Sequence, residues 1–444
     1  VEDWNKAFEA AGFKNAIRAL DPPSPEEDPD WSPEDIRYST VRWVATTIRN
    51  AVGPSVSDPR SGEIIESDIV WYHNHMRSYR NRLMIETGAA NPDARKLKLD
   101  DDLIGETMRQ VIAHEIGHAL GLPHNMQSSS AYPVDSLRSG TFTQKYGIAT
   151  TIMEYARQNY IAQPGDENIR FIRQLGPYDD YVINWGYRVI DVPGPEEEKP
   201  ILDSWIEEKA GDPVYRFASS TGWDPSAQTE DLSNDPVQAS TYGLMNLKRV
   251  VPNLIEWTAT EGEDYSDLDE IYGELVGQWS RYARHVATNV GGVYQNRKAS
   301  DQDGPVYTPV PKAYQKKAMT FMNEHAFSTP DWLLDEEILR RIEHAGALDR
   351  IRSLQGRLLI STMNAGVMSR LSEQEAMNPS EAYSLLEMLN DLRRGLWAEI
   401  YQREAIDAYR RNLQRVYITT IGNMFEEDQV GRVDVAQSDI RAAL

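Results

Sequence analysis

The sequence contains no cysteine among its 444 residues. This absence excludes disulfide bonds, catalytic thiols, iron–sulfur clusters and any zinc site built on thiolates. It leaves the redox compartment open, because a protein without thiols is compatible with an oxidising or a reducing environment. The chain is long enough to divide its apolar residues between two or three packed cores.

Long apolar runs and basic residues are also scarce. No stretch approaches the roughly 20 apolar residues that a membrane-spanning helix requires, so the sequence predicts no transmembrane segment. The chain carries 69 acidic and 46 basic side chains, a formal net charge of −23. Such a body repels phosphate backbones, so we expect no nucleic-acid partner. The chain starts at Val1 in an amphipathic pattern, which indicates a processed or trimmed chain without a signal peptide.

Histidine is rare too, with eight in the whole chain, yet three of them lie within eleven residues. They occur in the run HEIGHALGLPH as His114, His118 and His124. Two histidines four residues apart lie one turn apart on the same side of a helix, so both can bind one metal ion. Gly121 permits a sharp turn after the helix, which brings His124 back towards the first two. The pattern therefore predicts a zinc site formed by three imidazoles.

The residue beside the first histidine predicts what this zinc site does. Three neutral imidazoles leave the fourth position of zinc open for water, which is typical of catalytic sites. Glu115 lies next to the metal without binding it, where it can accept a proton from zinc-bound water. An HExxH run alone also arises by chance in unrelated helices, but the added Gly121 and His124 make chance a poor explanation.

The run resembles the H-E-x-x-H-x-x-G-x-x-H signature of metzincins, which are zinc peptidases. Metzincins also carry a Met-turn beneath the zinc, and the segment TIMEY at 151–155 resembles it. The resemblance implies that Met153 forms the floor of the metal site. In astacin-like and serralysin-like members a tyrosine follows two positions later. Tyr155 occupies that place, which implies a weak zinc ligand or an oxyanion partner.

Further segments resemble a group of large bacterial metzincin-like proteins, mostly known as uncharacterised zinc-dependent metalloproteases of Gram-negative envelopes. These segments are DWNKAFEAAGFKNAI, DIRYSTVRWV, SDPRSGEII, GPYDDYVINWGY and NVGGVY. The resemblance implies that further N-terminal domains and a signal peptide precede this chain in its precursor. It also implies a secreted, periplasmic or cell-surface location.

The patterning predicts an α+β fold for the first part of the chain. We expect strands at 38–45 and 63–72 and a helix at 100–120, whose apolar residues form one broad stripe. The Ser-, Gly- and Pro-rich segment 127–147 is expected to be mostly loop. Together these form a metzincin-like catalytic domain over residues 1–205, with a mixed sheet and an active-site helix.

The second part of the chain is expected to be a mainly helical domain over residues 206–444. The proline- and acid-rich run VPGPEEEKP at 192–200 is the clearest change in composition and places the boundary nearby. Asn378 is expected to cap a helix that starts at Pro379. The leucines at 385, 389, 392 and 396 recur at the spacing of one buried helix face.

The predicted function is that of a zinc-dependent endopeptidase with a peptide or protein substrate, in which Glu115 is the general base. Two alternatives stay open: a binding or adhesion module that keeps its zinc without proteolysis, and a zinc hydrolase of a non-peptide amide. His73 and His75 are expected to face solvent, although their alternation also allows both to line a cleft or bind a second metal.

Overall fold

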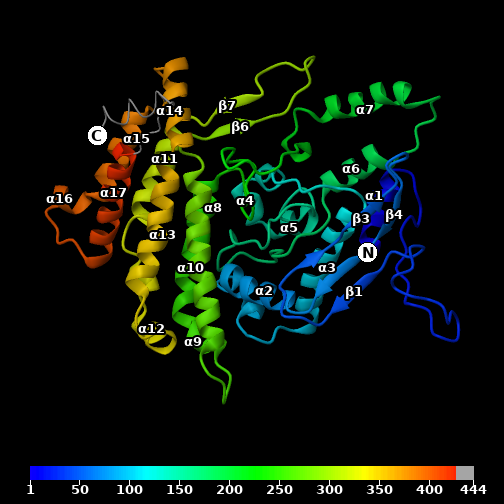
Figure 1. Ribbon diagram of the computed structural model, residues 1–444, viewed down its shortest axis with the longest axis horizontal. Helices are drawn as coiled ribbons and strands as arrows, with labels where there is room; N and C mark the ends of the chain where they lie inside the picture. Colours follow the sequence, from blue (N-terminus) through cyan, green and yellow to red (C-terminus); the bar gives the residue numbers. More distant parts are fainter. Residues whose placement is uncertain (427–444) are drawn as a thin grey trace. The chain divides into compact units, whose positions relative to one another are not determined.

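The computed structural model describes residues 1–426, which form two compact units. Unit 1 comprises Val1–Ser219 and Thr229–Asn234, and unit 2 comprises Ser220–Gln228 and the described part of Asp235–Leu444. Unit 1 combines helices with small sheets, which confirms the predicted α+β class (Figure 1). A domain boundary near residue 205 stays a prediction. Within residues 1–426, no helix is long and apolar enough to cross a membrane.

Unit 1 contains seven α-helices and five strands among its described residues. The helices are α1 (Asn5–Ala10), α2 (His75–Arg82), α3 (Asp101–Ala119), α4 (Val134–Leu137), α5 (Gly140–Tyr146), α6 (Pro177–Tyr187) and α7 (Pro195–Lys209). The strands are β1 (Val41–Val44), β2 (Ala51–Val52), β3 (Ser55–Ser57), β4 (Ile64–Ser67) and β5 (Ile69–Tyr72). A short 3-10 turn, Glu2–Trp4, precedes α1, and a π-helical segment, Leu83–Thr87, extends α2.

The mixed sheet has the order β1-β5-β2, with β1 parallel and β2 antiparallel to the central β5. The strand predicted at 63–72 is in fact two strands, because the chain changes partner at Asp68. Its carboxylate accepts hydrogen bonds from the backbone nitrogen (2.9 Å) and hydroxyl (2.8 Å) of Thr40. Before this point β4 pairs with β3 in a hairpin, and after it β5 enters the three-stranded sheet.

Helix α3 is the element around which unit 1 is built. It begins with Asp101 and Asp102, whose charges favour the positive end of the helix dipole. One side of α3 packs against β5 and β2. The other side meets the first residues of the chain, where Trp4 is fully buried and donates a hydrogen bond from its indole to the Ala113 carbonyl (2.9 Å). The helix is therefore held from both sides.

One segment of unit 1 that is predicted to be mostly loop contains helices, and another helix starts inside the run at 192–200. The segment 127–147 includes α4 and α5, and α5 starts after Ser139, whose hydroxyl accepts a bond from the Phe142 nitrogen (3.3 Å). The proline- and acid-rich run forms the start of α7. Pro195 occupies the first helical position and three glutamates follow in the first turn, both of which favour a helix N-terminus.

Unit 2 is mainly helical, as predicted. Its helices are α8 (Pro236–Val250), α9 (Leu254–Thr258), α10 (Ser266–Ala287), α11 (Lys312–Phe321), α12 (Glu336–Ile342), α13 (Ala347–Thr362), α14 (Ala365–Met377), α15 (Leu385–Leu396), α16 (Ala398–Gln402) and α17 (Ala408–Glu426). Strands β6 (Val293–Gln295) and β7 (Tyr307–Pro309) form an antiparallel hairpin. Helix α10 packs against α8 and α13, and α13 packs against α17.

The sequence pattern predicted one helix face of unit 2 correctly and one helix start wrongly. The four leucines of α15 are all buried. Its start, however, is not at Asn378. The Ser384 hydroxyl caps α15 by accepting a hydrogen bond from the Glu387 backbone nitrogen (3.1 Å). The Glu387 carboxylate in turn accepts one from the Ser384 backbone nitrogen (3.2 Å). This reciprocal capping box satisfies two backbone donors at the start of α15.

Candidate metal centre

The metal centre predicted from the histidine pattern lies at the C-terminal end of α3. His114 and His118 occupy successive turns, and the helix ends two residues before Gly121, which has a φ of +83°. The nitrogen of Leu122 bonds to the Gly117 carbonyl (3.0 Å), and that of Gly121 to the His118 carbonyl (2.9 Å). This pair of bonds is a Schellman motif. The motif reverses the chain and brings His124 back to the helix.

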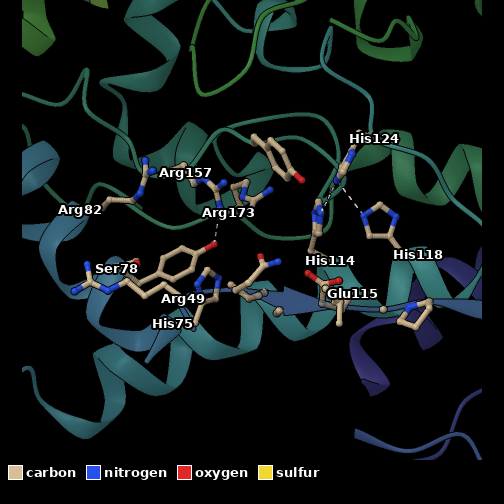
Figure 2. A pocket seen from close by; sticks show the side chains of 18 residues that line it. Arg49, His75, Ser78, Arg82, His114, Glu115, His118, His124, Arg157 and Arg173 are labelled. Carbon is tan, nitrogen blue, oxygen red and sulfur yellow. Dashed lines mark hydrogen bonds between the residues drawn. The ribbon is translucent and has the colours of Figure 1, made fainter. Parts of the chain in front are cut away.

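The Nε2 atoms of the three histidines converge on one point, as Figure 2 shows. The Nε2 atom of His124 lies 3.1 Å from that of His114 and 3.0 Å from that of His118. Zinc–nitrogen bonds of about 2.0–2.1 Å in tetrahedral geometry place two ligand atoms about 3.3 Å apart. The spacing therefore fits three ligands of one zinc ion.

The other ring nitrogens determine which atoms are free to bind a metal. Nδ1 of His114 donates to the Ile152 carbonyl (2.7 Å), and Nδ1 of His118 donates to the Leu122 carbonyl (2.8 Å). Because a carbonyl only accepts, each Nδ1 carries the proton and each Nε2 keeps its lone pair. Burial lowers the pKa of His114 well below its ordinary value and that of His124 to about 4. The donor set is thus one of neutral imidazoles, which suits zinc.

Glu115 lies on the same cavity wall as the histidines. Its side chain is buried, which raises the pKa of its carboxyl to about 7, against the opposing influence of the cationic Arg173 and Arg157. The end of β2 comes very close to it, since a Cβ on Gly53 would lie 2.7 Å from the Glu115 carbonyl oxygen. A glycine is required there, and it allows the edge of the sheet to meet the helix at the site.

The segment resembling a Met-turn lies beneath the histidines. Met153 is buried, and its sulfur fills the space that a side chain on Gly117 would occupy, at 2.1 Å from the ideal Cβ position. Asp179 holds this turn by accepting bonds from the Thr151 hydroxyl (2.5 Å) and the Ile152 nitrogen (3.0 Å). The Ile152 carbonyl in turn orients His114. The segment therefore supports the metal centre from below.

Tyr155 lies beside the histidines, as the resemblance implied. Its ring centroid is 4.4 Å from that of His124 and 5.6 Å from that of His114. The guanidinium of Arg157 stands 4.7 Å from the centre of the same ring. Burial raises the pKa of the phenol, so the hydroxyl stays protonated and is a hydrogen-bond donor at neutral pH.

A cavity of about 510 Å³ opens beside the three histidines. Apart from the predicted residues, its walls include side chains that the sequence analysis did not single out: Arg49, Ser78, Tyr79, Arg82, Arg157 and Arg173. The four arginines lie between positions 49 and 173 and form no sequence motif, so only the fold brings them together. The prediction that His75 faces solvent is wrong. It is buried at the start of α2 and lines this cavity, whereas His73 is exposed.

Comparison with known proteins supports the metal centre. A family model described as Met-zincin matches residues 96–404, more than half of the chain. The match includes all three histidines, Glu115 and Tyr155. Neither the curated proteins nor the solved structures include a significant match.

Proposed function

Because the chain belongs to the Met-zincin family, a family of zinc-dependent metallopeptidases, we propose that it is an endopeptidase whose catalytic zinc is held by His114, His118 and His124. The observation that carries this proposal is the convergence of three Nε2 lone pairs, 3.0 and 3.1 Å apart, on the wall of an open cavity. With Nδ1 of His114 and His118 protonated, their two Nε2 lone pairs face the same point. A cation is what makes such an arrangement favourable.

The proposed reaction divides the work among three groups. When bound, zinc supplies a Lewis acid that polarises the scissile carbonyl and makes water more acidic. Glu115 accepts a proton from the attacking water and later passes it to the departing amine. Tyr155 donates a hydrogen bond to the oxygen that becomes negative in the transition state. Asp179 and the Ile152 carbonyl keep His114 in the orientation that this chemistry requires.

The test compares the wild type with Glu115→Gln, which keeps the size of the side chain and removes its basicity. We expect about one zinc per chain in both proteins, measured by elemental analysis. Cleavage of a mixed peptide library, followed by mass spectrometry, should fall at least about 100-fold in the variant. Zinc in both proteins with cleavage by neither would favour a binding module, and cleavage of amides other than peptides would favour the other alternative. A protein that binds no zinc after reconstitution contradicts the proposal.

Tyr155→Phe separates the role of the tyrosine from that of the metal ligands. We expect zinc content to be unchanged and kcat to fall about 10- to 1000-fold, since a lost oxyanion donor weakens the transition state and not the bound substrate. The measurement is a steady-state assay on one cleaved peptide. An unchanged kcat would mean that Tyr155 only packs against the histidines.

A further inference from the structure

The cavity beside the metal centre is rich in positive charge. Among the described residues that line it are four arginines, Arg49, Arg82, Arg157 and Arg173, against one carboxylate, that of Glu115. This concentration contrasts with the formal charge of −23 for the whole chain. In the view of Figure 2, Arg157 and Arg173 lie between the histidines and Arg82. The positive charge therefore lies in the same cavity as the three histidines.

Two of these arginines are held in place by carboxylates that do not line the cavity. Glu230 lies 2.9 Å from Nε of Arg157 and 3.1 Å from Nη2 of Arg82. Arg157 also donates to the hydroxyl of Tyr79 (3.1 Å). These contacts engage Nε and Nη1 of the Arg157 guanidinium and fix its orientation. Glu86 lies 3.6 Å from Nη1 of Arg82, so these two arginines are matched by two carboxylates behind the cavity wall, and neither carboxylate lines the cavity itself.

Arg173 is the cavity arginine in contact with the segment that resembles a Met-turn. It is only 2% exposed, and its Nη1 donates to the Ile152 carbonyl (3.0 Å). Its Nε atom has no hydrogen-bond partner among the described residues, and no carboxylate of residues 1–426 forms an ion pair with it. A guanidinium stays charged even when buried. A buried guanidinium that has a carbonyl partner but no ion pair is costly, so an anion that enters the cavity relieves that cost.

We infer that this cavity is a subsite for a carboxylate of the peptide substrate, with Arg157 and Arg173 as the residues that determine the specificity. The inference rests on the proposed peptidase function and adds the chemistry of its substrate. Carboxylates are the anions that unmodified peptides carry, and guanidinium groups bind them with paired hydrogen bonds. The volume of about 510 Å³ is ample for an acidic side chain and its neighbours.

The carboxylate has two possible sources, an acidic side chain or the C-terminus of the peptide. Binding is therefore measured with a dansylated alanine hexapeptide in which one Glu is moved through each position. A matched set carries Gln instead, and both sets are made with a free and with an amidated C-terminus. The protein is zinc-loaded Glu115→Gln, so that binding is read without cleavage. Fluorescence anisotropy gives the Kd of each peptide.

We expect at least one Glu peptide to bind 10-fold or more tightly than its Gln partner, or the free acids to bind that much more tightly than the amides. The first result identifies an acidic side chain and the second a terminal carboxylate. In either case the preference should shrink at high salt. Equal Kd values for acidic and neutral peptides in both comparisons would overturn the inference.

Arginine variants assign the preference to the cavity. In the Glu115→Gln background, Arg157→Gln and Arg173→Met should bring the ratio of acidic to neutral Kd values close to one. Arg157→Lys and Arg173→Lys should keep part of the preference. Arg60→Gln is the matched control, because it removes the same charge from a side chain that is 86% exposed in a hairpin away from the cavity. A structural role alone would weaken acidic and neutral peptides equally and leave the ratio unchanged.

The outcomes for this inference and for the proposed function can be told apart. If wild type cleaves peptides without any preference for carboxylates, the function stands and the inference fails. If wild type cleaves nothing while Glu115→Gln binds acidic peptides through Arg157 or Arg173, the inference stands and the function fails. If Arg173→Met does not fold, as judged by thermal melting and zinc content, the Arg157→Gln, Arg157→Lys and Arg173→Lys variants test whether the cavity arginines carry the preference for carboxylates.

Discussion

Gly117 explains how a buried methionine can lie directly under the metal-binding helix. The residue occupies the second variable position between His114 and His118, where any side chain is allowed by the zinc pattern alone. In the structure, its missing side chain leaves room for the sulfur of Met153 and, at 3.0 Å from the ideal Cβ, for the ring of Trp4. The helix, the turn beneath it and the start of the chain thus meet at one glycine.

We predict that Gly117→Ala destabilises the protein by about 1–3 kcal/mol, because the new methyl group must displace buried neighbours. Zinc affinity should fall as well, since Met153 and the two adjacent histidines move together. The matched control is Gly105→Ala in the same helix, where a Cβ meets no atom within 4 Å. That change should stabilise by about 0.5–1 kcal/mol, because alanine favours a helix more than glycine does. Chemical denaturation measures both, and equal effects would contradict the packing argument.

At the scale of elements, α3 depends on the residues that precede the sheet. The carboxylate of Asp3 accepts two bonds from Arg109, from Nε (2.7 Å) and Nη2 (2.6 Å), and this pair attaches the N-terminal segment to α3. The hydrogen bond from Arg109 lowers the pKa of Asp3 below its ordinary value. The pair therefore stabilises the fold above the unfolded pKa of Asp3, and this stabilisation is lost as the pH falls through the folded value.

We predict that Arg109→Gln lowers the free energy of unfolding by at most about 1 kcal/mol at pH 7, since Arg109 is largely exposed and solvent screens the pair. The difference from wild type should shrink as the pH falls through the folded pKa of Asp3 and disappear once Asp3 is protonated in both states. Thermal melts over pH 2–7 provide the measurement. A difference that persists at the lowest pH would mean that Arg109 acts through packing and not through charge.

Elements with one dominant local signal were the ones that the sequence predicted well. Helix α3 combines an acidic start, a continuous apolar stripe and a glycine stop, and its predicted ends at 100 and 120 lie within one residue of the observed ones. The helix start at Asn378 failed because two capping signals lie six residues apart, and Ser384 forms the complete capping box. Helix α7 starts inside the run at 192–200, for which no helix was predicted, and Pro195 stands at the first helical position, where a helix tolerates proline.

The candidate site likewise has one part that local sequence signals predict and one part that they do not. The three histidines and Glu115 are close in sequence, so the geometry of α3 and of the turn that ends it brings them together. Arg157 and Arg173 reach the cavity from irregular segments after the segment that resembles a Met-turn. Arg49 reaches it from just before β2, and Arg82 from the end of α2. Their proximity depends on sheet order and on the path of loops, which no spacing rule encodes. His75 belongs with them, since its burial follows from the packing of α2.

At the scale of the whole molecule, we predict that zinc stabilises unit 1 and leaves unit 2 unaffected, because all three proposed ligands lie in unit 1. Free zinc at 100 times its Kd should add about 2.7 kcal/mol to the stability of the unit that binds it. Removal of zinc by a chelator should lower the melting temperature of unit 1 alone, as measured by calorimetry. Hydrogen exchange assigns the transition, and equal shifts in both units would indicate that they unfold together.

The N-terminal residues that pack against α3 also make the metal centre sensitive to proteolytic cleavage of the chain that follows them. Residues 14–40 contain no helix or strand, and Leu20 within them is 77% exposed, so a protease has ready access there. After a single cut, Trp4 and Phe8 would be joined to α3 only by their non-covalent contacts. The catalytic unit would then be a two-chain complex that loses its activity on dilution, although every residue of the cavity is intact.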